Sequence, residues 1–228
     1  MSIHKDHRQR VRKRYEEHGL DSFEEHQALE LLLFYAIAQK DTNELAHNLI
    51  NRFKTFGQVL DAPISELEKV EGIGHNTALY LKLLRDCQRY YGIHKEQGEA
   101  ILNDINDCGQ YLIKYFDAIK VETVYLLGLD AKKKVICCRE VSKGSVNSAS
   151  VSVRKIVEIA LSESVTSVIL AHNHPSGLAL PSAEDLYTTK RVALALAAVD
   201  VKLVDHIIVC DSDFVSLVQS GIFNPDFC

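Results

Sequence analysis

The sequence predicts an α/β protein in which a small all-helical domain precedes a layered domain, whose sheet is covered by helices on both faces. From Phe23 to about Tyr91, apolar residues recur at helical spacing. After residue 100, short apolar runs alternate with helical patterns, which is typical of a sheet packed between helices. We therefore place the helical domain at residues 1–95 and the α/β domain at residues 100–228.

The overall composition is that of a globular protein. The chain has 228 residues, and its apolar fraction of 46% is enough to bury two cores. No run approaches the roughly 18 apolar residues that a membrane-spanning helix needs. Its first fifteen residues are too polar for a secretion signal, so we expect a cytoplasmic protein.

The cysteine pattern argues against a disulfide-bonded scaffold, and the net charge argues against a general nucleic-acid-binding protein. The six cysteines form no C-x-x-C pair and are too sparse for a disulfide scaffold, so we expect reduced thiols. They are Cys87, Cys108, Cys137, Cys138, Cys210 and Cys228. A net charge of -5 argues against a protein that binds nucleic acid over its whole surface. The basic cluster from Arg8 to Arg14 remains as a local candidate, although a solvated helix face explains it more simply.

The helical half contains LEKVEGIGHNTALYLKLL at residues 67–84, which looks like a helix-hairpin-helix. In that motif the glycines, here Gly72 and Gly74, leave backbone N–H groups at a helix N-terminus free to bind a DNA phosphate. Glu71 stands before the glycines and His75 stands where a DNA-binding protein would profit from a basic residue. A hairpin that only packs is therefore an equal alternative.

The second half has several predicted elements. VETVYLLGLD and KKVICCREV are strands on either side of a turn at Asp130. A helix is expected from about Val153 to Leu161, a buried strand at TSVILAH, a helix at PSAEDLYTTKRVALALAAV and a strand at VKLVDHIIVC.

The stretch AHNHPSGLALPSAED at residues 171–185 begins at the carboxyl end of the buried strand. Side chains two apart on a strand point to the same face, so His172 and His174 can reach one point while Asn173 turns away. Asp185 enters in the first turn of the next helix and can face back toward the strand. Two histidines and one carboxylate are the ligand set of an open catalytic zinc site.

A purely structural interpretation explains part of this stretch. Ser182 and Asp185 are close to a capping-box pattern, which satisfies the free N–H groups at a helix start. That pattern does not account for two histidines on one face of a strand. We therefore favour metal binding, with one zinc ion per chain.

The pattern H-x-H-P-x6-S-x-x-D, formed by His172, His174, Pro175, Ser182 and Asp185, resembles the JAMM signature of MPN-type zinc metallopeptidases and isopeptidases. HNHPSG followed by PSAED resembles the bacterial RadC family in particular. The resemblance covers nearly the whole chain and implies a JAMM/MPN domain with a cytidine-deaminase-like sheet, preceded by a helix-hairpin-helix segment.

The resemblance also implies a glutamate that acts as general base on the zinc-bound water, and Glu140 is the position that we match to it. Glu158, Glu163 and Glu184 are competing candidates, as is a surface role for Glu140 itself. Ser182 would donate a hydrogen bond to the developing oxyanion.

Other motifs are set aside. His206 lies in the strand LVDHIIVC and is expected to be packed and hydrogen-bonded, not metal-bound. The contiguous letters H-N-H do not match an HNH nuclease, which spreads its motif over a hairpin and a helix. A zinc deaminase requires H-x-E together with P-C-x-x-C, and the chain has no P-C-x-x-C.

Two functions remain. The first is a zinc hydrolase that cuts a peptide or isopeptide bond in an unknown protein or peptide, with the helical domain recruiting DNA or a protein. The second is a non-catalytic DNA-associated binding module with a structural or vestigial metal. The intact ligand set and Glu140 favour the first. We expect no membrane partner and only weak, sequence-independent DNA binding.

Overall fold

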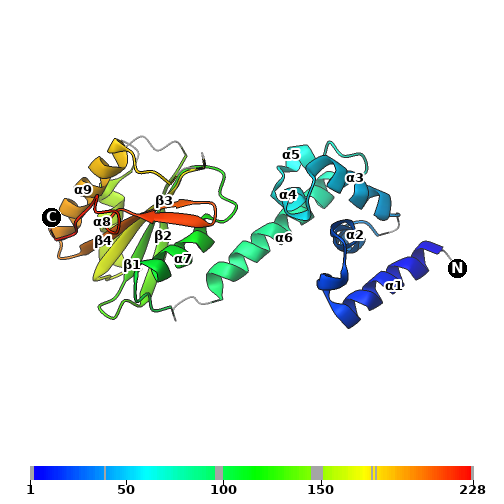
Figure 1. The fold of residues 1–228 in the computed structure, drawn as a ribbon, viewed down its shortest axis with the longest axis horizontal. Helices are drawn as coiled ribbons and strands as arrows, with labels where there is room; N and C mark the ends of the chain where they lie inside the picture. The colour runs from blue at the N-terminus through cyan, green and yellow to red at the C-terminus, as the bar shows by residue number, and fades with distance from the viewer. Residues whose placement is uncertain are drawn as a thin grey trace. The chain divides into compact units, whose positions relative to one another are not determined.

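The computed structural model describes residues 3–38, 40–95, 100–144, 151–175, 177 and 179–226. The chain divides into two compact units, Met1–Gln88 and Arg89–Cys228 (Figure 1). The predicted boundary between residues 95 and 100 lies beyond this division, which falls within one long helix, α6 (His75–His94). In the part of the chain that the structure describes, no helix is long and apolar enough to cross a membrane.

The N-terminal unit is helical throughout its described residues, as predicted. Its elements are α1 (Ile3–His18), a 3-10 turn η1 (Leu20–Ser22), α2 (Glu25–Ala36), α3 (Asn43–Phe53), α4 (Phe56–Asp61), α5 (Ile64–Leu67) and the first part of α6. Five fully buried leucines form the centre of its core, namely Leu29, Leu33, Leu49, Leu67 and Leu81. These side chains come from four helices. Because helices this short are barely stable in isolation, packing into one shared core is what stabilises them.

The sheet of the C-terminal unit has the strand order β2-β1-β3-β4-β5. The strands are β1 (Thr123–Leu129), β2 (Val135–Lys143), β3 (Ser167–Asn173), β4 (Lys202–Cys210) and β5 (Asp213–Ser216). The β3 and β4 strands are parallel, and every other neighbouring pair is antiparallel. The predicted turn between β1 and β2 is confirmed, because the Asp130 carboxylate accepts bonds from the backbone N–H groups of Lys132 and Lys134.

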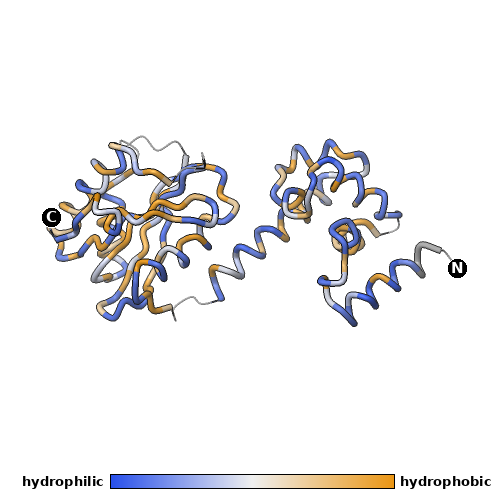
Figure 2. Tube along the Cα trace, in the orientation of Figure 1, coloured by the Kyte–Doolittle hydropathy of each residue, from blue (hydrophilic) through white to orange (hydrophobic). Residues whose placement is uncertain are grey.

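Helices cover both faces of this sheet, as the sequence predicted. One face packs against α8 (Val153–Ser162) and α9 (Ala183–Ala197), and the other packs against α7 (Ile105–Phe116). Figure 2 shows the hydrophobic colouring gathered on the central strands. Neither α7 nor the short strand β5 was anticipated from the sequence.

The cysteines fit the expectation of reduced thiols where the structure describes them. Five are free, namely Cys87, Cys108, Cys137, Cys138 and Cys210. Cys228 lies outside the described residues.

Candidate metal centre

Two histidines meet at the carboxyl end of β3. His172 is the penultimate residue of the strand and His174 is the first residue after it. Their Nε2 atoms lie 2.8 Å apart, so the two rings converge on one point, as the strand period predicts. Asn173 points the other way: its Oδ1 accepts a bond from the Thr123 backbone N–H at 2.8 Å.

The third side chain comes from the start of α9. The Asp185 Oδ1 atom lies 3.2 Å from His172 Nε2, and its Oδ2 atom lies 3.8 Å from His174 Nε2. Asp185 also completes a capping box with Ser182, whose backbone N–H and hydroxyl both donate to Oδ2, at 2.7 and 2.6 Å. Oδ2 therefore serves the helix cap while Oδ1 faces His172, so the capping role of Asp185 is compatible with the metal-ligand role predicted for it.

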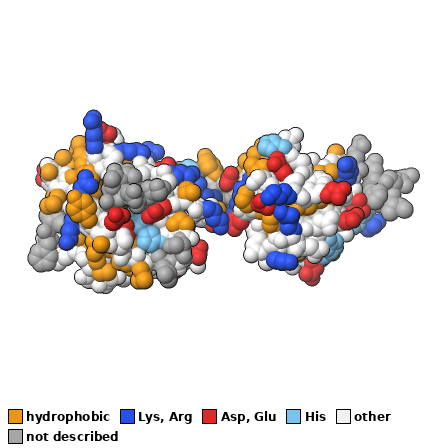
Figure 3. Space-filling view, turned by 90° about the horizontal axis from the view of Figure 1, so that it is seen from above, with side chains coloured by type: hydrophobic (Ala, Val, Ile, Leu, Met, Phe, Trp, Pro, Cys, Tyr) orange, Lys and Arg blue, Asp and Glu red, His pale blue; other side chains and the backbone are white. Residues whose placement is uncertain are grey.

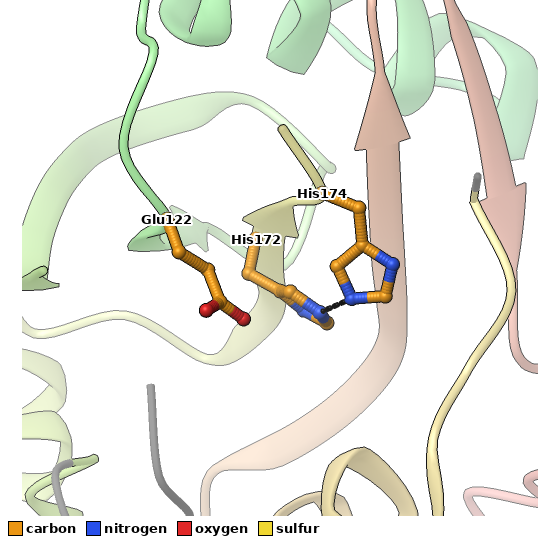
Figure 4. Close-up of side chains that lie close together, drawn as sticks. All are labelled: Glu122, His172 and His174. Carbon is orange, nitrogen blue, oxygen red and sulfur yellow. Dashed lines mark hydrogen bonds between the residues drawn. The ribbon is translucent and has the colours of Figure 1, made fainter. Parts of the chain in front are cut away.

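A second carboxylate, that of Glu122, also lies close to the histidine pair. Glu122 lies immediately before β1, and its carboxylate shares a cluster with His172 and His174 in which the candidate ligand atoms are all within 4.8 Å of one another. Figure 4 shows its side chain pointing toward the two imidazoles. The Nδ2 atom of Asn173 donates to the backbone carbonyls of Ile119 and Val121, so the middle residue of the H-N-H stretch fastens the segment that carries Glu122.

These side chains line a cavity of about 450 Å³. His172 and Asp185 are buried, whereas Glu122 and His174 are half-buried and accessible from outside. Apolar residues from the sheet, among them Val124 and Leu170, form part of its wall. Figure 3 shows carboxylates and a histidine gathered on one surface of the C-terminal unit. A polar cluster at the bottom of a partly apolar pocket is typical of a ligand site.

Burial favours the neutral form of the His172 and His206 imidazoles. It lowers the pKa of His172 to about 4, and His174 acts in the same direction while the Asp185 carboxylate opposes it. Burial also holds the pKa of His206 well below its ordinary range, with the neighbouring histidines adding to the effect. Neutral rings carry a nitrogen lone pair, which is the form that binds metal ions.

Glu140, which we matched to the general base, lies elsewhere. It pairs with Tyr125 across β1 and β2, and Tyr125 packs in the core on the α7 side of the sheet. His172 pairs with Val124, whose side chain belongs to the core on the α8 and α9 side. The exposed Glu140 side chain is therefore on the opposite face from the histidines, and the structure does not bring it into the cluster.

The competing glutamates are placed as follows. Glu158 pairs with Arg154 at 2.7 Å, and Glu163 pairs with Arg139 at 2.6 Å, so both belong to surface ion pairs. Glu184 lines the cavity but is exposed at its rim. Glu122 was missed in the sequence, because it precedes a strand and has no motif residues beside it.

His206 was set aside from the sequence and lies beside the site. Its Nε2 atom is 2.8 Å from His172 Nδ1, and its Nδ1 atom is 2.6 Å from the Thr189 hydroxyl. It is packed and hydrogen-bonded, as expected, but its partner is one of the two converging histidines. Its place in β4, the strand that runs parallel to β3, is what brings it there.

The residues considered for nucleic acid lie in the N-terminal unit. Gly72 has a φ of +91°, so the turn before α6 requires a left-handed conformation there, and a Cβ on it would contact Leu45. Gly74 stands at the start of α6, and a Cβ added to it would meet nothing within 4 Å. In the basic cluster, Arg8 donates to three backbone carbonyls and Arg14 to the Ser22 carbonyl, which are structural contacts.

The C-terminal unit is a mixed α/β domain that carries a cluster of histidines and carboxylates at the end of one strand. The RadC-like JAB domain family matches residues 102–222, which is more than half of the chain. The chain therefore belongs to the RadC family, as its motif indicated.

Several bacterial relatives are similar over almost their whole length. A UPF0758 protein of Fusobacterium nucleatum is 32% identical and covers 95% of this chain and 96% of its own length. UPF0758 proteins of Neisseria meningitidis serogroup B and Pseudoalteromonas translucida are 31% and 32% identical, each over 94% of this chain and 95% and 96% of their own lengths. Their names state no activity.

Proposed function

We propose that the protein is a zinc-dependent hydrolase that cleaves an amide bond, of the peptide or isopeptide type, in a protein or peptide. The observation that carries this proposal is the approach of the Asp185 carboxylate to the paired imidazoles of His172 and His174, with the Glu122 carboxylate close to the same two rings. The substrate class rests on the resemblance of the motif to JAMM peptidases.

The donor set fits a zinc ion. Zinc prefers imidazole nitrogen and carboxylate oxygen at about 2.0–2.2 Å in tetrahedral geometry, so its ligand atoms should lie roughly 3.3 Å apart. His172 Nε2 lies 2.8 Å from His174 Nε2 and 3.2 Å from Asp185 Oδ1, and the other Asp185 oxygen, Oδ2, lies 3.8 Å from His174 Nε2. Three protein ligands also leave one position for water or substrate, which distinguishes a catalytic site from a closed structural one.

Asp185 and Glu122 compete for the role of third ligand, and we assign it to Asp185. Its carboxylate lies close to both histidine nitrogens and is held by the Ser182 cap. When bound, zinc supplies Lewis acidity, which polarises a carbonyl and makes water acidic near neutral pH.

Glu122 then has the position of a general base and acid. Its carboxylate would accept a proton from the attacking water as the new O–C bond forms. It would return that proton to the amine nitrogen as the C–N bond breaks. Its half-buried position beside the histidines allows both transfers within one cavity.

For Ser182 the structure favours a supporting role over the oxyanion role expected from the sequence. Its hydroxyl donates to Asp185 Oδ2 at 2.6 Å and accepts from the Asp185 backbone N–H at 3.1 Å. Stabilising an oxyanion would require this proton to leave the carboxylate. We propose that Ser182 mainly orients the metal ligand.

The first prediction concerns metal content. The protein purified without chelators should hold about one zinc ion per chain, measured by elemental analysis. His174→Ala and Asp185→Asn should lose most of it, because each removes one of three ligands. Glu122→Gln should keep it. Equal zinc in wild type and His174→Ala, or loss of zinc in Glu122→Gln with retention in Asp185→Asn, would show that the ligands are assigned wrongly.

The second prediction concerns the base. In a screen with fluorogenic peptides and isopeptide-linked lysine peptides, Glu122→Gln should lower turnover on the order of 10²-fold or more, since an amide cannot accept the proton. Glu140→Gln is the matched control and should retain wild-type turnover, because it lies on the other face of the sheet.

Two outcomes would contradict this assignment. Full activity of Glu122→Gln together with an inactive Glu140→Gln or Glu184→Gln would move the base to that residue. A zinc-loaded wild type that cleaves none of these amide bonds would favour the alternative of a non-catalytic binding module.

For the helical domain we propose weak DNA contact at the N-terminus of α6. Gly74 marks this N-terminus, since its carbonyl accepts the first helical bonds from Thr77 and Ala78. Glu68 and Glu71 precede it in the sequence, and the visible face of the unit in Figure 3 mixes basic and acidic side chains. Few phosphate contacts are therefore available, and affinity should be on the order of 10⁻⁵ M and fall only shallowly with salt.

The third prediction tests this contact in the full chain with a fluorescent duplex and anisotropy at two salt concentrations. Gly74→Asp places a good helix cap at the site and adds a negative charge, so it should preserve folding and abolish binding. Gly74→Ser, a cap without charge, should bind like wild type. If Gly74→Asp binds DNA as well as Gly74→Ser, the hairpin serves packing alone.

A further inference from the structure

A chain of hydrogen bonds links the first metal-ligand candidate to the backbone of the third. His172 Nδ1 is 2.8 Å from His206 Nε2, and His206 Nδ1 is 2.6 Å from the Thr189 hydroxyl. The same hydroxyl lies 2.6 Å from the backbone carbonyl of Asp185, one turn earlier in α9. These members come from β3, β4 and α9 and are almost completely buried.

The direction of this chain follows from the number of protons available. A carbonyl oxygen only accepts, so the Thr189 hydroxyl must donate its single proton to the Asp185 carbonyl. The hydroxyl then accepts from His206 Nδ1, which must carry a proton. In a buried neutral His206 the other ring nitrogen, Nε2, has a lone pair and accepts from His172 Nδ1.

The consequence appears at the far end of the chain. With its proton on Nδ1, the His172 ring presents an unprotonated Nε2 to His174 and Asp185. The opposite tautomer would place a proton on Nε2, 3.2 Å from Asp185 Oδ1. That arrangement would be an ordinary histidine–carboxylate hydrogen bond, and it would leave no lone pair for a cation.

We propose that His206 and Thr189 are positioning residues that hold His172 in the tautomer able to bind the metal. This inference rests on the proposed function, in which His172 is a ligand. Ligand histidines usually donate their second ring N–H to a carboxylate, carbonyl or water. Here a second imidazole takes that place, and the threonine in turn determines which of its nitrogens accepts.

The arrangement also explains a polar residue in a buried strand. His206 is 2% exposed in β4 and lies between the fully buried Asp205 and Ile207. Asp205 has its own partners, the Ser216 hydroxyl at 2.5 Å and the Val218 backbone N–H at 3.1 Å, and does not use the His206 ring.

The test compares two substitutions at one buried position. Thr189→Val keeps the shape but removes the hydroxyl, and should weaken zinc binding roughly 10- to 100-fold, the range found for outer partners of metal ligands. Thr189→Ser keeps the hydroxyl and should bind like wild type. His206→Phe should weaken binding at least as much as Thr189→Val. Affinity is measured on the full chain by competition with a chromophoric zinc chelator, and the visible spectrum of the Co²⁺-loaded protein reports the ligand geometry.

A second measurement does not depend on zinc. Two-bond ¹H–¹⁵N spectra of the metal-free wild type report which nitrogen of each imidazole is protonated, and loss of signals in His206→Phe assigns that ring. We expect a proton on Nδ1 of both His172 and His206. A proton on Nε2 of His172 would overturn the inference, as would wild-type zinc affinity and Co²⁺ spectrum in Thr189→Val.

These outcomes separate the two proposals. A wild type that binds no zinc contradicts the proposed function. In that case the ¹H–¹⁵N spectra of the metal-free protein still test whether the hydrogen bonds place the proton of His172 on Nδ1. A wild type that binds zinc while Thr189→Val and His206→Phe bind it equally well contradicts only the positioning role.

Discussion

The parallel pairing of β3 with β4 is the constraint on which the site depends. Parallel neighbours cannot be joined by a tight turn, so the chain must leave the end of β3, cross the face of the sheet as α9, and return. This crossover brings the first turn of α9, with Asp185, back to His172 and His174. The same pairing places His206 of β4 next to His172. One topological requirement thus assembles both the candidate ligands and their support.

Several polar contacts at this site stabilise the fold and at the same time hold the candidate site residues in place. The capping box that starts α9 also fixes the Asp185 carboxylate, leaving one oxygen directed at the histidines. Asn173 fastens the segment before β1 and thereby places Glu122. Because each contact satisfies a backbone group that would otherwise be unpaired, the precise arrangement of the site is maintained by interactions that folding itself requires.

The sequence predicted the local parts of this site and missed the parts that depend on register. The strand period and the helix start were enough to bring together His172, His174 and Asp185, and the apolar pattern was enough for the helical unit and the main strands. Glu140 was matched to the general base that the resemblance implies, a glutamate on an earlier strand. Its face depends on how β2 pairs with β1, and that pairing contains two irregularities that no local pattern reveals. His206 was missed as a neighbour of the site for the same reason, since parallel register is set by packing.

Zinc K-edge X-ray absorption of the zinc-loaded full chain tests the central claim most directly, that the end of β3 and the start of α9 form one zinc site. We predict a four-coordinate first shell of nitrogen and oxygen at about 2.0–2.1 Å. The outer-shell scattering should fit two imidazole rings in the wild type and one ring in His174→Ala. A sulfur shell at about 2.3 Å, which would place zinc on the cysteines, or a spectrum unchanged by His174→Ala, would contradict it.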